Sequence, residues 1–261
     1  MKILPIDKNR IIIKQASTSK ITGKWKDAVD LIVERYKTIF GSKLVSVYIN
    51  GSVATGDAVE GTSDIDTNAV VDMTDEEITE LDRTILPNQI KSLSVLLPFV
   101  SKVEIHVHSK DNWSDRKRFQ MKITGVCVYG KNYDDETPEY ALSKETFQKF
   151  RVSVPKDVHE ALLKLAGAVD VNETKKIATW VAKRLIRNAG TLVMWKGDFY
   201  TMDILLLAEL FAKGYPEKKE EINTLLGWVN NPPENKQVIV NFLDTFGNWL
   251  IDEDERVFQV L

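Results

Sequence analysis

The sequence has very little of the chemistry that cysteine and histidine provide. Its 261 residues include one cysteine, Cys127, and three histidines. A single cysteine excludes a disulfide within the chain, which fits a cytoplasmic protein. The apolar neighbours in GVCVYG indicate a buried small side chain rather than a reactive thiol. With so few sulfur and imidazole ligands, a zinc site is not expected.

Long apolar runs and an excess of basic charge are also missing. There is no stretch of 18 apolar residues, and the first ten residues lack the apolar core of a signal peptide. We therefore expect no membrane partner and a cytoplasmic location. The net charge is −3, whereas proteins that hold a long duplex by its phosphates are usually basic. Duplex nucleic acid is not an expected partner.

One stretch does carry a distinctive pattern, GSVATGDAVEGTSDID at residues 51–66. The apolar runs LVSVYI before it and TNAVV after it indicate a strand, a turn with a short helix, and a second strand. Asp64 and Asp66 are two residues apart, so in a strand their side chains point to the same face. Because neighbouring carboxylates repel each other and Mg²⁺ prefers oxygen ligands, this pair predicts a magnesium site.

The beginning of the same stretch predicts a phosphate site. Gly51 and Ser52 lie where a strand enters a helix. A glycine lets a phosphate approach the backbone, and the first turn of a helix offers free N–H groups and the positive end of the helix dipole. The predicted metal and phosphate sites therefore lie on adjoining elements.

This combination resembles the nucleotidyltransferase superfamily that includes DNA polymerase beta, poly(A) polymerases and the aminoglycoside nucleotidyltransferases. The motifs that carry the resemblance are Gly51-Ser52 and Asp64-Ile65-Asp66. It covers residues 44–131 with specific motifs and residues 172–216 more loosely, and it is greatest to the bacterial aminoglycoside-type members. The resemblance implies an α/β catalytic domain with a small mixed sheet.

The second half of the chain has a different pattern. The acidic, proline-containing segment DDETPE at residues 134–139 indicates a domain boundary, and the pattern beyond it is helical throughout. We therefore expect a nucleotidyltransferase domain over residues 1–140. A C-terminal all-α helical bundle over residues 141–261 would contribute to substrate and nucleotide binding.

A third carboxylate is implied by the resemblance, on a strand beside the Asp-x-Asp strand. In KVEIHVHS, residues 102–109, apolar and polar residues alternate as they do in a strand with one polar face. Glu104 is the matching residue, and the resemblance implies that it takes the proton of the acceptor hydroxyl. His106 and His108 share its face, and whether they take part stays open.

Several charged residues have two interpretations each. The basic residues of segment 116–122 form either an exposed helix face or a contact for phosphates. Arg184 and Arg187 lie on one helix face, which is either a solvated edge or a site for the nucleotide phosphates. Asp198 and Asp203 either stabilise a turn and a helix start or recognise an amine-rich substrate.

The reaction that the resemblance implies is in-line transfer of a nucleoside monophosphate from an NTP to a hydroxyl, with release of pyrophosphate. ATP is the usual donor in the superfamily, and two Mg²⁺ ions would serve as cofactors. The acceptor would be a small molecule such as an aminoglycoside. Alternative acceptors are a tRNA end or a protein side chain, as in toxin-type members. A nucleotide-binding protein without turnover is a third interpretation, and the oligomeric state stays open.

Overall fold

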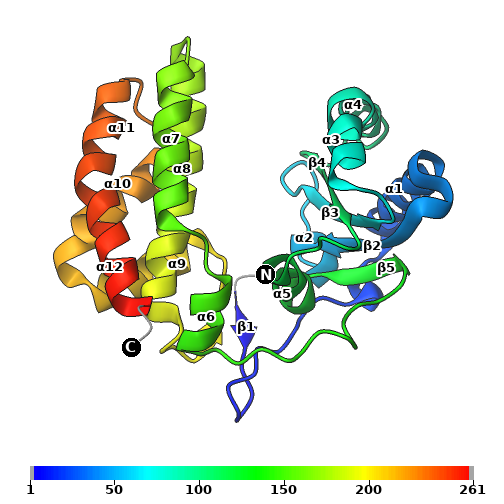
Figure 1. The fold of residues 1–261 in the computed structure, drawn as a ribbon, viewed down its shortest axis with the longest axis horizontal. Coiled ribbons are helices and arrows are strands. Elements are labelled where there is room, and N and C mark those ends of the chain that lie inside the picture. The colour runs from blue at the N-terminus through cyan, green and yellow to red at the C-terminus, as the bar shows by residue number, and fades with distance from the viewer. Residues whose placement is uncertain (1–2, 259–261) are drawn as a thin grey trace. The chain divides into compact units, whose positions relative to one another are not determined.

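The chain folds into two compact units in a computed structural model that describes residues 3–258 (Figure 1). The first unit is Ile13–Tyr140, and the second combines the segment up to Ile12 with the chain from Ala141 onward. The division near residue 140 lies directly after the acidic segment 134–139. The start of the chain differs from the expected domain over residues 1–140, because the segment before Ile13 packs with the second unit.

Backbone pairing explains where the N-terminal segment goes. Strand β1 (Leu4–Pro5) pairs antiparallel with β6 (Phe199–Tyr200), which lies in the second half of the chain. The guanidinium of Arg10 donates hydrogen bonds of 2.9–3.1 Å to three carbonyl groups of the same unit, those of Leu142, Trp195 and Gly197. These contacts are long-range in sequence, so no local pattern could have indicated them.

The first unit contains a four-stranded mixed sheet, as expected. The strands are β2 (Leu44–Asn50), β3 (Ile65–Val71), β4 (Val103–Ser109) and β5 (Val126–Gly130), in the spatial order β4-β3-β2-β5. Strand β2 is antiparallel to both of its neighbours, whereas β3 and β4 run parallel. The parallel pair sets Asp66 directly beside Glu104.

One face of the sheet is largely apolar and holds the main core of the first unit, with Thr67 of β3 as a buried polar residue that bonds to the hydroxyl of Tyr36. Helices α1 (Gly23–Phe40), α3 (Asp75–Thr84) and α4 (Leu86–Leu96) share this core with alternate residues of β2, β3 and β4. The capping box at Thr74 and Glu77 fixes the start of α3. Burial of this face leaves the other face of the sheet as the place for polar chemistry.

The opposite face is divided into an apolar part and a polar part. Helix α5 (Asp115–Thr124) covers the apolar part, where Met121 and the preceding Trp113 pack with Tyr48 of β2 and Val70 of β3. The polar part lies beside the apolar part, toward the end of β2, and carries the carboxylates. The short helix α2 (Gly51–Thr55) follows β2 directly at this end.

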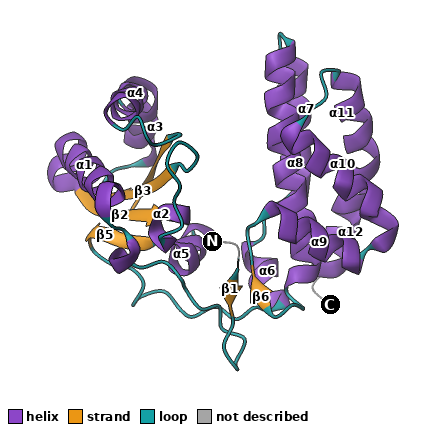
Figure 2. Ribbon diagram, turned by 180° about the vertical axis from the view of Figure 1, so that it is seen from behind, coloured by secondary structure: helices purple, strands orange, loops and turns teal. Residues whose placement is uncertain are grey.

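The second unit is helical apart from the β1–β6 pair (Figure 2). Its helices are α6 (Lys144–Phe150), α7 (Val154–Gly167), α8 (Val171–Met194), α9 (Ile204–Gly214), α10 (Lys219–Asn230), α11 (Lys236–Phe242) and α12 (Asn248–Phe258). A π-helical segment, Leu243–Gly247, joins the last two. The all-α expectation is thus correct for residues after 141, except for the strand at Phe199–Tyr200.

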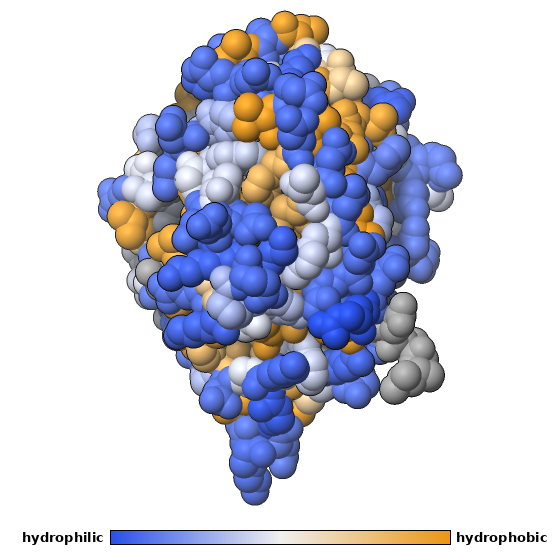
Figure 3. All heavy atoms as spheres, turned by 90° about the vertical axis from the view of Figure 1, so that its left-hand side faces the viewer, coloured by the Kyte–Doolittle hydropathy of each residue, from blue (hydrophilic) through white to orange (hydrophobic). Residues whose placement is uncertain are grey.

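The surface of the helical unit is mainly hydrophilic, with apolar side chains gathered toward the upper part of the face in Figure 3. Exposed apolar residues of this unit include Leu163, Val169 and Val238. Among residues 3–258, no helix combines the length and the apolar character that crossing a membrane requires.

Candidate active site

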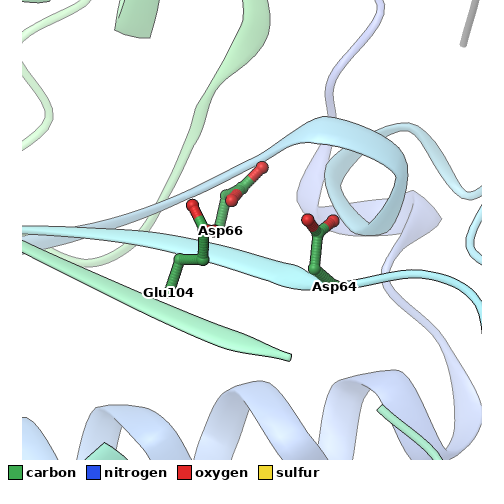
Figure 4. A group of neighbouring side chains, drawn as sticks. All are labelled: Asp64, Asp66 and Glu104. Atoms are coloured by element: carbon green, nitrogen blue, oxygen red, sulfur yellow. The ribbon is translucent and has the colours of Figure 1, made fainter. Parts of the chain in front are cut away.

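Three carboxylates meet at one end of the polar face. Asp64 immediately precedes β3, Asp66 is the second residue of β3, and Glu104 is the second residue of β4. One oxygen from each of the three lies within 4.8 Å of the others (Figure 4). The alternation of side chains along the strands and the register of β3 against β4 together bring the three residues to one place.

The carboxylates shift one another's proton affinity. Burial, together with the charges of Asp64 and Glu104, raises the pKa of Asp66 to about 7. The pKa of Glu104 is lowered, chiefly by a hydrogen bond from the ammonium group of Lys102. In the absence of a cation, Asp66 therefore holds a proton near neutral pH while Glu104 is ionised. A divalent cation would replace that proton.

The ligand chemistry of this cluster fits magnesium. All three groups offer hard oxygen atoms, and Asp64 is exposed while Asp66 and Glu104 are partly buried. In the described part of the chain, the cluster of Asp64, Asp66 and Glu104 contains no sulfur or imidazole atom. Such a set suits Mg²⁺, which usually binds one or two carboxylates and completes its shell with water and substrate phosphates.

The glycine–serine turn lies beside the carboxylates. Gly51 has a φ of 71°, a left-handed conformation that favours glycine. A Cβ atom at this position would be 3.3 Å from Oδ2 of Asp66, so a larger residue would crowd the carboxylate. Ser52 follows in the first turn of α2 and is partly buried. The predicted phosphate turn and the predicted metal site are therefore neighbours.

A chain of side-chain hydrogen bonds fixes the residue just before this turn. Asn50, the last residue of β2, donates from Nδ2 to Thr124 Oγ1 at 3.0 Å, and its Oδ1 accepts from Asn68 Nδ2 at 2.9 Å. Both asparagines are buried. Asn50 makes no side-chain cap to α2, because its amide is engaged in this chain of bonds. The first N–H groups of α2 are thus left for another partner.

Strand β4 and helix α5 complete the polar face. Nε2 of His106 lies 3.7 Å from Oε2 of Glu104, and Nε2 of His108 lies 3.0 Å from Oδ1 of Asn68. The same Asn68 oxygen accepts a hydrogen bond from Lys117 Nζ at 3.4 Å. Burial lowers the pKa of His108 to about 4 and lowers that of His106 as well, so both imidazoles are neutral at pH 7.

Sequence reasoning did not find all of these residues. Asn50 and Asn68 were not singled out, although Asn68 continues the alternation of Asp64 and Asp66 along the same face. The alternation over residues 102–109 also puts Lys102 on the face of Glu104, a signal in the sequence for the ion pair between them. Lys117 belonged to a basic cluster with two interpretations, and the structure shows it to be partly buried on the polar face of the sheet rather than on an exposed helix face.

The arginines of α8 lie in the helical unit. Arg184 donates from Nε to Oδ1 of Asp157 at 3.0 Å, and its Nη2 lies 3.0 Å from the same oxygen. Asn188 donates to Oδ2 of the same carboxylate. Asp157 is fully buried, so this pair holds α7 and α8 together. Arg187 is partly buried in the same helix. The expected contact of both arginines with nucleotide phosphates stays a prediction.

The two aspartates predicted to recognise an amine have different surroundings. Asp198 is exposed in the turn before β6. Asp203 caps α9, since its Oδ1 accepts hydrogen bonds from the N–H groups of Leu205 and Leu206 at 3.0 and 3.1 Å. A capping carboxylate is already well bonded, so Asp203 has a clear structural role. Recognition of a substrate amine by either residue stays a prediction.

Comparison with known proteins identifies the class. Residues 29–122 match the family model of the nucleotidyltransferase domain. The fold is similar to spectinomycin adenyltransferase AAD(9) from Enterococcus faecialis, solved with ATP and spectinomycin. The TM-score is 0.52 at 12% identity, covering 88% of this chain and 99% of the other. A search of curated protein sequences gives no match.

These findings fit the geometry of the site. The family match spans α2, the Asp-x-Asp strand and β4, which are the elements that bring the carboxylates and the glycine–serine turn together. The chain contains a nucleotidyltransferase domain, and the protein is a nucleotidyltransferase enzyme. The resemblance inferred from the sequence is thereby confirmed, and so is the mixed α/β fold with C-terminal helices.

Proposed function

We propose that this enzyme transfers AMP from ATP to a hydroxyl group in a Mg²⁺-dependent reaction that releases pyrophosphate. The observation that supports this most directly is the meeting of Asp64, Asp66 and Glu104 within 4.8 Å, beside the Gly51–Ser52 turn. Oxygen ligands for a divalent cation and backbone donors for a phosphate chain are two requirements of nucleotidyl transfer.

Each residue would have a distinct task. Asp64 and Asp66 would bind two Mg²⁺ ions, which supply charge neutralisation for the phosphates and the attacking oxygen. Ser52 and the backbone around Gly51 would hold the terminal phosphates of ATP, because the first turn of α2 has N–H groups to donate. Arg184 and Arg187 remain candidates for further phosphate contacts.

Glu104 would accept the proton of the attacking hydroxyl. A general base must be ionised when the substrate arrives and must lie within hydrogen-bond reach of the proton. The ammonium of Lys102 holds the pKa of Glu104 below its usual range, so the carboxylate is ionised at pH 7. It lies next to Asp66 on the neighbouring strand, which supports a position close to the attacking oxygen.

The acceptor is proposed to be a small hydroxyl compound. The structural neighbour was solved with spectinomycin, which makes spectinomycin and aminoglycosides the first compounds to test. Asp198 and Asp203 would contact an amine of such a compound. A tRNA end or a protein side chain is the second kind of acceptor, and a binding role without turnover is the remaining alternative.

Transfer assays with α-³²P-labelled ATP test the proposal. We expect label to move to an acceptor from a panel of aminoglycosides, cellular RNA and cellular protein, and we expect EDTA to abolish the transfer. The Asp64→Asn variant serves as the control for the metal site. If Mg²⁺ does not raise the affinity for ATP, measured by calorimetry, the catalytic proposal is wrong and a role without turnover takes its place.

A further inference from the structure

Lys117 is a cation on the polar face that the proposed mechanism does not use. It belongs to the first turn of α5, where the apolar cover of the sheet ends and the polar part begins. Its ammonium donates to Oδ1 of Asn68 at 3.4 Å, a long hydrogen bond to a neutral group. The side chain is partly buried, so part of its hydration is lost.

This ammonium has a charge without a close counterion. Among the ion pairs within 4.0 Å that involve described residues, none includes Lys117, whereas Lys102 is paired with Glu104 and Lys110 with Asp72. Asp66 acts on it only as a more distant charge, and burial lowers its pKa. A partly buried cation is costly unless an anion or several hydrogen-bond acceptors compensate for the lost water.

The neighbours of Lys117 are donors as well. His106 is half exposed, and His108 is bonded to the same Asn68 oxygen as Lys117. The positive charge of Lys117 helps to keep both imidazoles neutral. Lys117 therefore presents an ammonium donor to the polar face, and the neutral ring of His106 has one N–H to offer beside it, a composition that suits an anionic group.

The order of the strands indicates which substrate this anionic group belongs to. Strand β3, with Asp66, lies between β2 and β4. The phosphate turn follows β2 on one side, whereas Glu104 and His106 belong to β4 on the other. The triphosphate would occupy the β2 side and the acceptor hydroxyl the β4 side, next to Glu104. Lys117 shares the Asn68 oxygen with His108 of β4, so a group bonded to Lys117 from this side would be part of the acceptor.

We propose that Lys117 and His106 form an acceptor subsite that binds a phosphate or carboxylate group carried close to the accepting hydroxyl. This inference rests on the proposed function, since it places the acceptor beside Glu104. Of the acceptors named in the proposed function, it therefore favours an anionic small compound or an RNA end over the aminoglycosides, which carry amines close to their hydroxyls. Both a small phosphorylated or carboxylated compound and the end of an RNA chain have this chemistry.

The first test measures binding of inorganic phosphate by calorimetry. The protein is saturated with Mg²⁺ and adenosine 5′-(α,β-methylene)triphosphate, so that the nucleotide site is filled. We expect phosphate to bind the wild-type chain, and Lys117→Met to weaken this binding about tenfold or more, as loss of a hydrogen bond between charged groups does. Lys117→Arg keeps the charge and should bind within a few-fold of wild type.

A matched control removes a charge elsewhere on the same unit. Lys110 is paired with Asp72 on the surface, and Lys110→Met should bind phosphate like the wild type. Equal affinity of the analogue for wild type and Lys117→Met shows that the fold and the nucleotide site are intact. If the analogue fails to bind the wild type, the proposed function fails. If it binds but phosphate does not, or Lys117→Met keeps the phosphate affinity, the subsite is wrong.

The second test compares acceptors. Labelled AMP is offered to glycerol 3-phosphate, to 3-amino-1,2-propanediol and to deacylated tRNA. We expect the wild type to prefer an anionic acceptor and Lys117→Met to lose this preference. Comparison of glycerol 3-phosphate with tRNA distinguishes a small anionic compound from an RNA end. Preference of the wild type for the amine compound overturns the inference. If none of the three accepts label, the phosphate titration decides.

Discussion

At the scale of single residues, Glu104 offers the sharpest test of the mechanism. Glutamine has the same shape but cannot accept a proton, and general-base catalysis contributes about 10²- to 10⁴-fold. Glu104→Gln should therefore bind ATP·Mg²⁺ with near wild-type affinity while transfer falls by that factor. Titration of ATP followed by single-turnover transfer provides both quantities.

The two quantities distinguish three roles for Glu104. If Glu104→Gln transfers AMP within a few-fold of the wild-type rate, Glu104 is an ordinary polar residue of β4. Collapse of ATP·Mg²⁺ binding would make it chiefly a metal ligand, and His106, 3.7 Å away, would be the next candidate for the base. Lys102→Met is a useful companion variant, because Lys102 is the main cause of the lowered pKa of Glu104.

Asp66 links the active site to stability. Its pKa rises from 3.8 in the unfolded chain to about 7 in the fold, so the fold keeps a proton that the unfolded chain has lost. The contribution of Asp66 to the stability of the metal-free protein therefore falls as pH rises from about 4 to 7. Asp66→Asn removes this dependence. In EDTA at pH 8 we expect the variant to melt no lower than wild type, although transfer is lost.

Melting curves in EDTA between pH 4 and pH 8 provide the measurement. Across this range, the wild-type melting temperature should fall relative to that of Asp66→Asn. A variant that melts several degrees lower than wild type at pH 8 would show that Asp66 is needed for the fold, and the metal site would then have to be reassigned.

Ser52 tests the phosphate turn. One hydrogen bond to a charged phosphate contributes about 1.5–3 kcal/mol, so Ser52→Ala should weaken ATP·Mg²⁺ binding by an amount in this range. Calorimetric titration measures the change. Unchanged affinity would place the terminal phosphates away from Gly51 and Ser52.

At the scale of secondary-structure elements, Gly125 shows how closely α5 and β5 approach β2. A Cβ atom there would lie 2.9 Å from Nδ2 of Asn50 and 3.1 Å from the carbonyl oxygen of Met121. Gly125→Ala should destabilise the protein by about 1–3 kcal/mol, the usual cost of overpacking. Denaturant unfolding gives the value, and reduced ATP affinity should accompany it because Asn50 precedes the phosphate turn.

Gly227 in α10 is the matched control. It is exposed, and a Cβ atom there would meet nothing within 4 Å. Gly227→Ala should stabilise the protein by about 0.4–1 kcal/mol through the lower entropy of the unfolded chain. Should both substitutions have the same effect on unfolding, the close approach at Gly125 would not be the cause.

The strands and helices of the first unit could be predicted because their signals are local. The alternation in β4 and the apolar stripe of α1 are both readable from neighbouring residues. The position of α5 could not be predicted, because its cover of the sheet depends on Trp113 and Met121 meeting Tyr48 across a long stretch of chain. The β1–β6 pair was missed for the same reason.

The site shows the same division between local and long-range information. The spacing of residues alone predicts Asp64, Asp66 and the glycine–serine turn as site residues. Glu104 could be predicted only from the resemblance, because the sequence does not show which strands are neighbours in the sheet. The contact of Arg184 with Asp157 could not be predicted, because no local pattern reveals an ion pair with another helix. Likewise, no local pattern in the sequence distinguishes the partly buried Lys117 from its exposed neighbours.

At the scale of the whole molecule, metal binding should appear as a change in melting temperature. A ligand that binds only the folded state raises the unfolding free energy, and Mg²⁺ must displace the proton of Asp66. Because the pKa of Asp66 is about 7, the increase produced by Mg²⁺ should be larger at pH 8 than at pH 6. Thermal unfolding with and without Mg²⁺ at both pH values measures it.

The Asp66→Asn variant should show little increase at either pH, which ties the effect to this carboxylate. Ca²⁺ in place of Mg²⁺ gives a further comparison, since Ca²⁺ takes more ligands at longer distances. If Mg²⁺ raises the melting temperature of the wild type equally at pH 6 and pH 8, this would contradict the protonation of Asp66.

The N-terminal segment has a consequence for how the chain is assembled from parts. Ile11 pairs with Ala141, and the N–H of Leu142 donates to the carbonyl oxygen of Arg10 at 2.7 Å. The chain thus leaves the helical unit and returns to it at adjacent points, so residues 13–140 are topologically an insertion. A short linker from Ile12 to Ala141 could excise this insertion while leaving both strands of the β1–β6 ladder in the remaining protein. The same junction would accept a different module, which makes it a natural site for recombination and for engineered fusions.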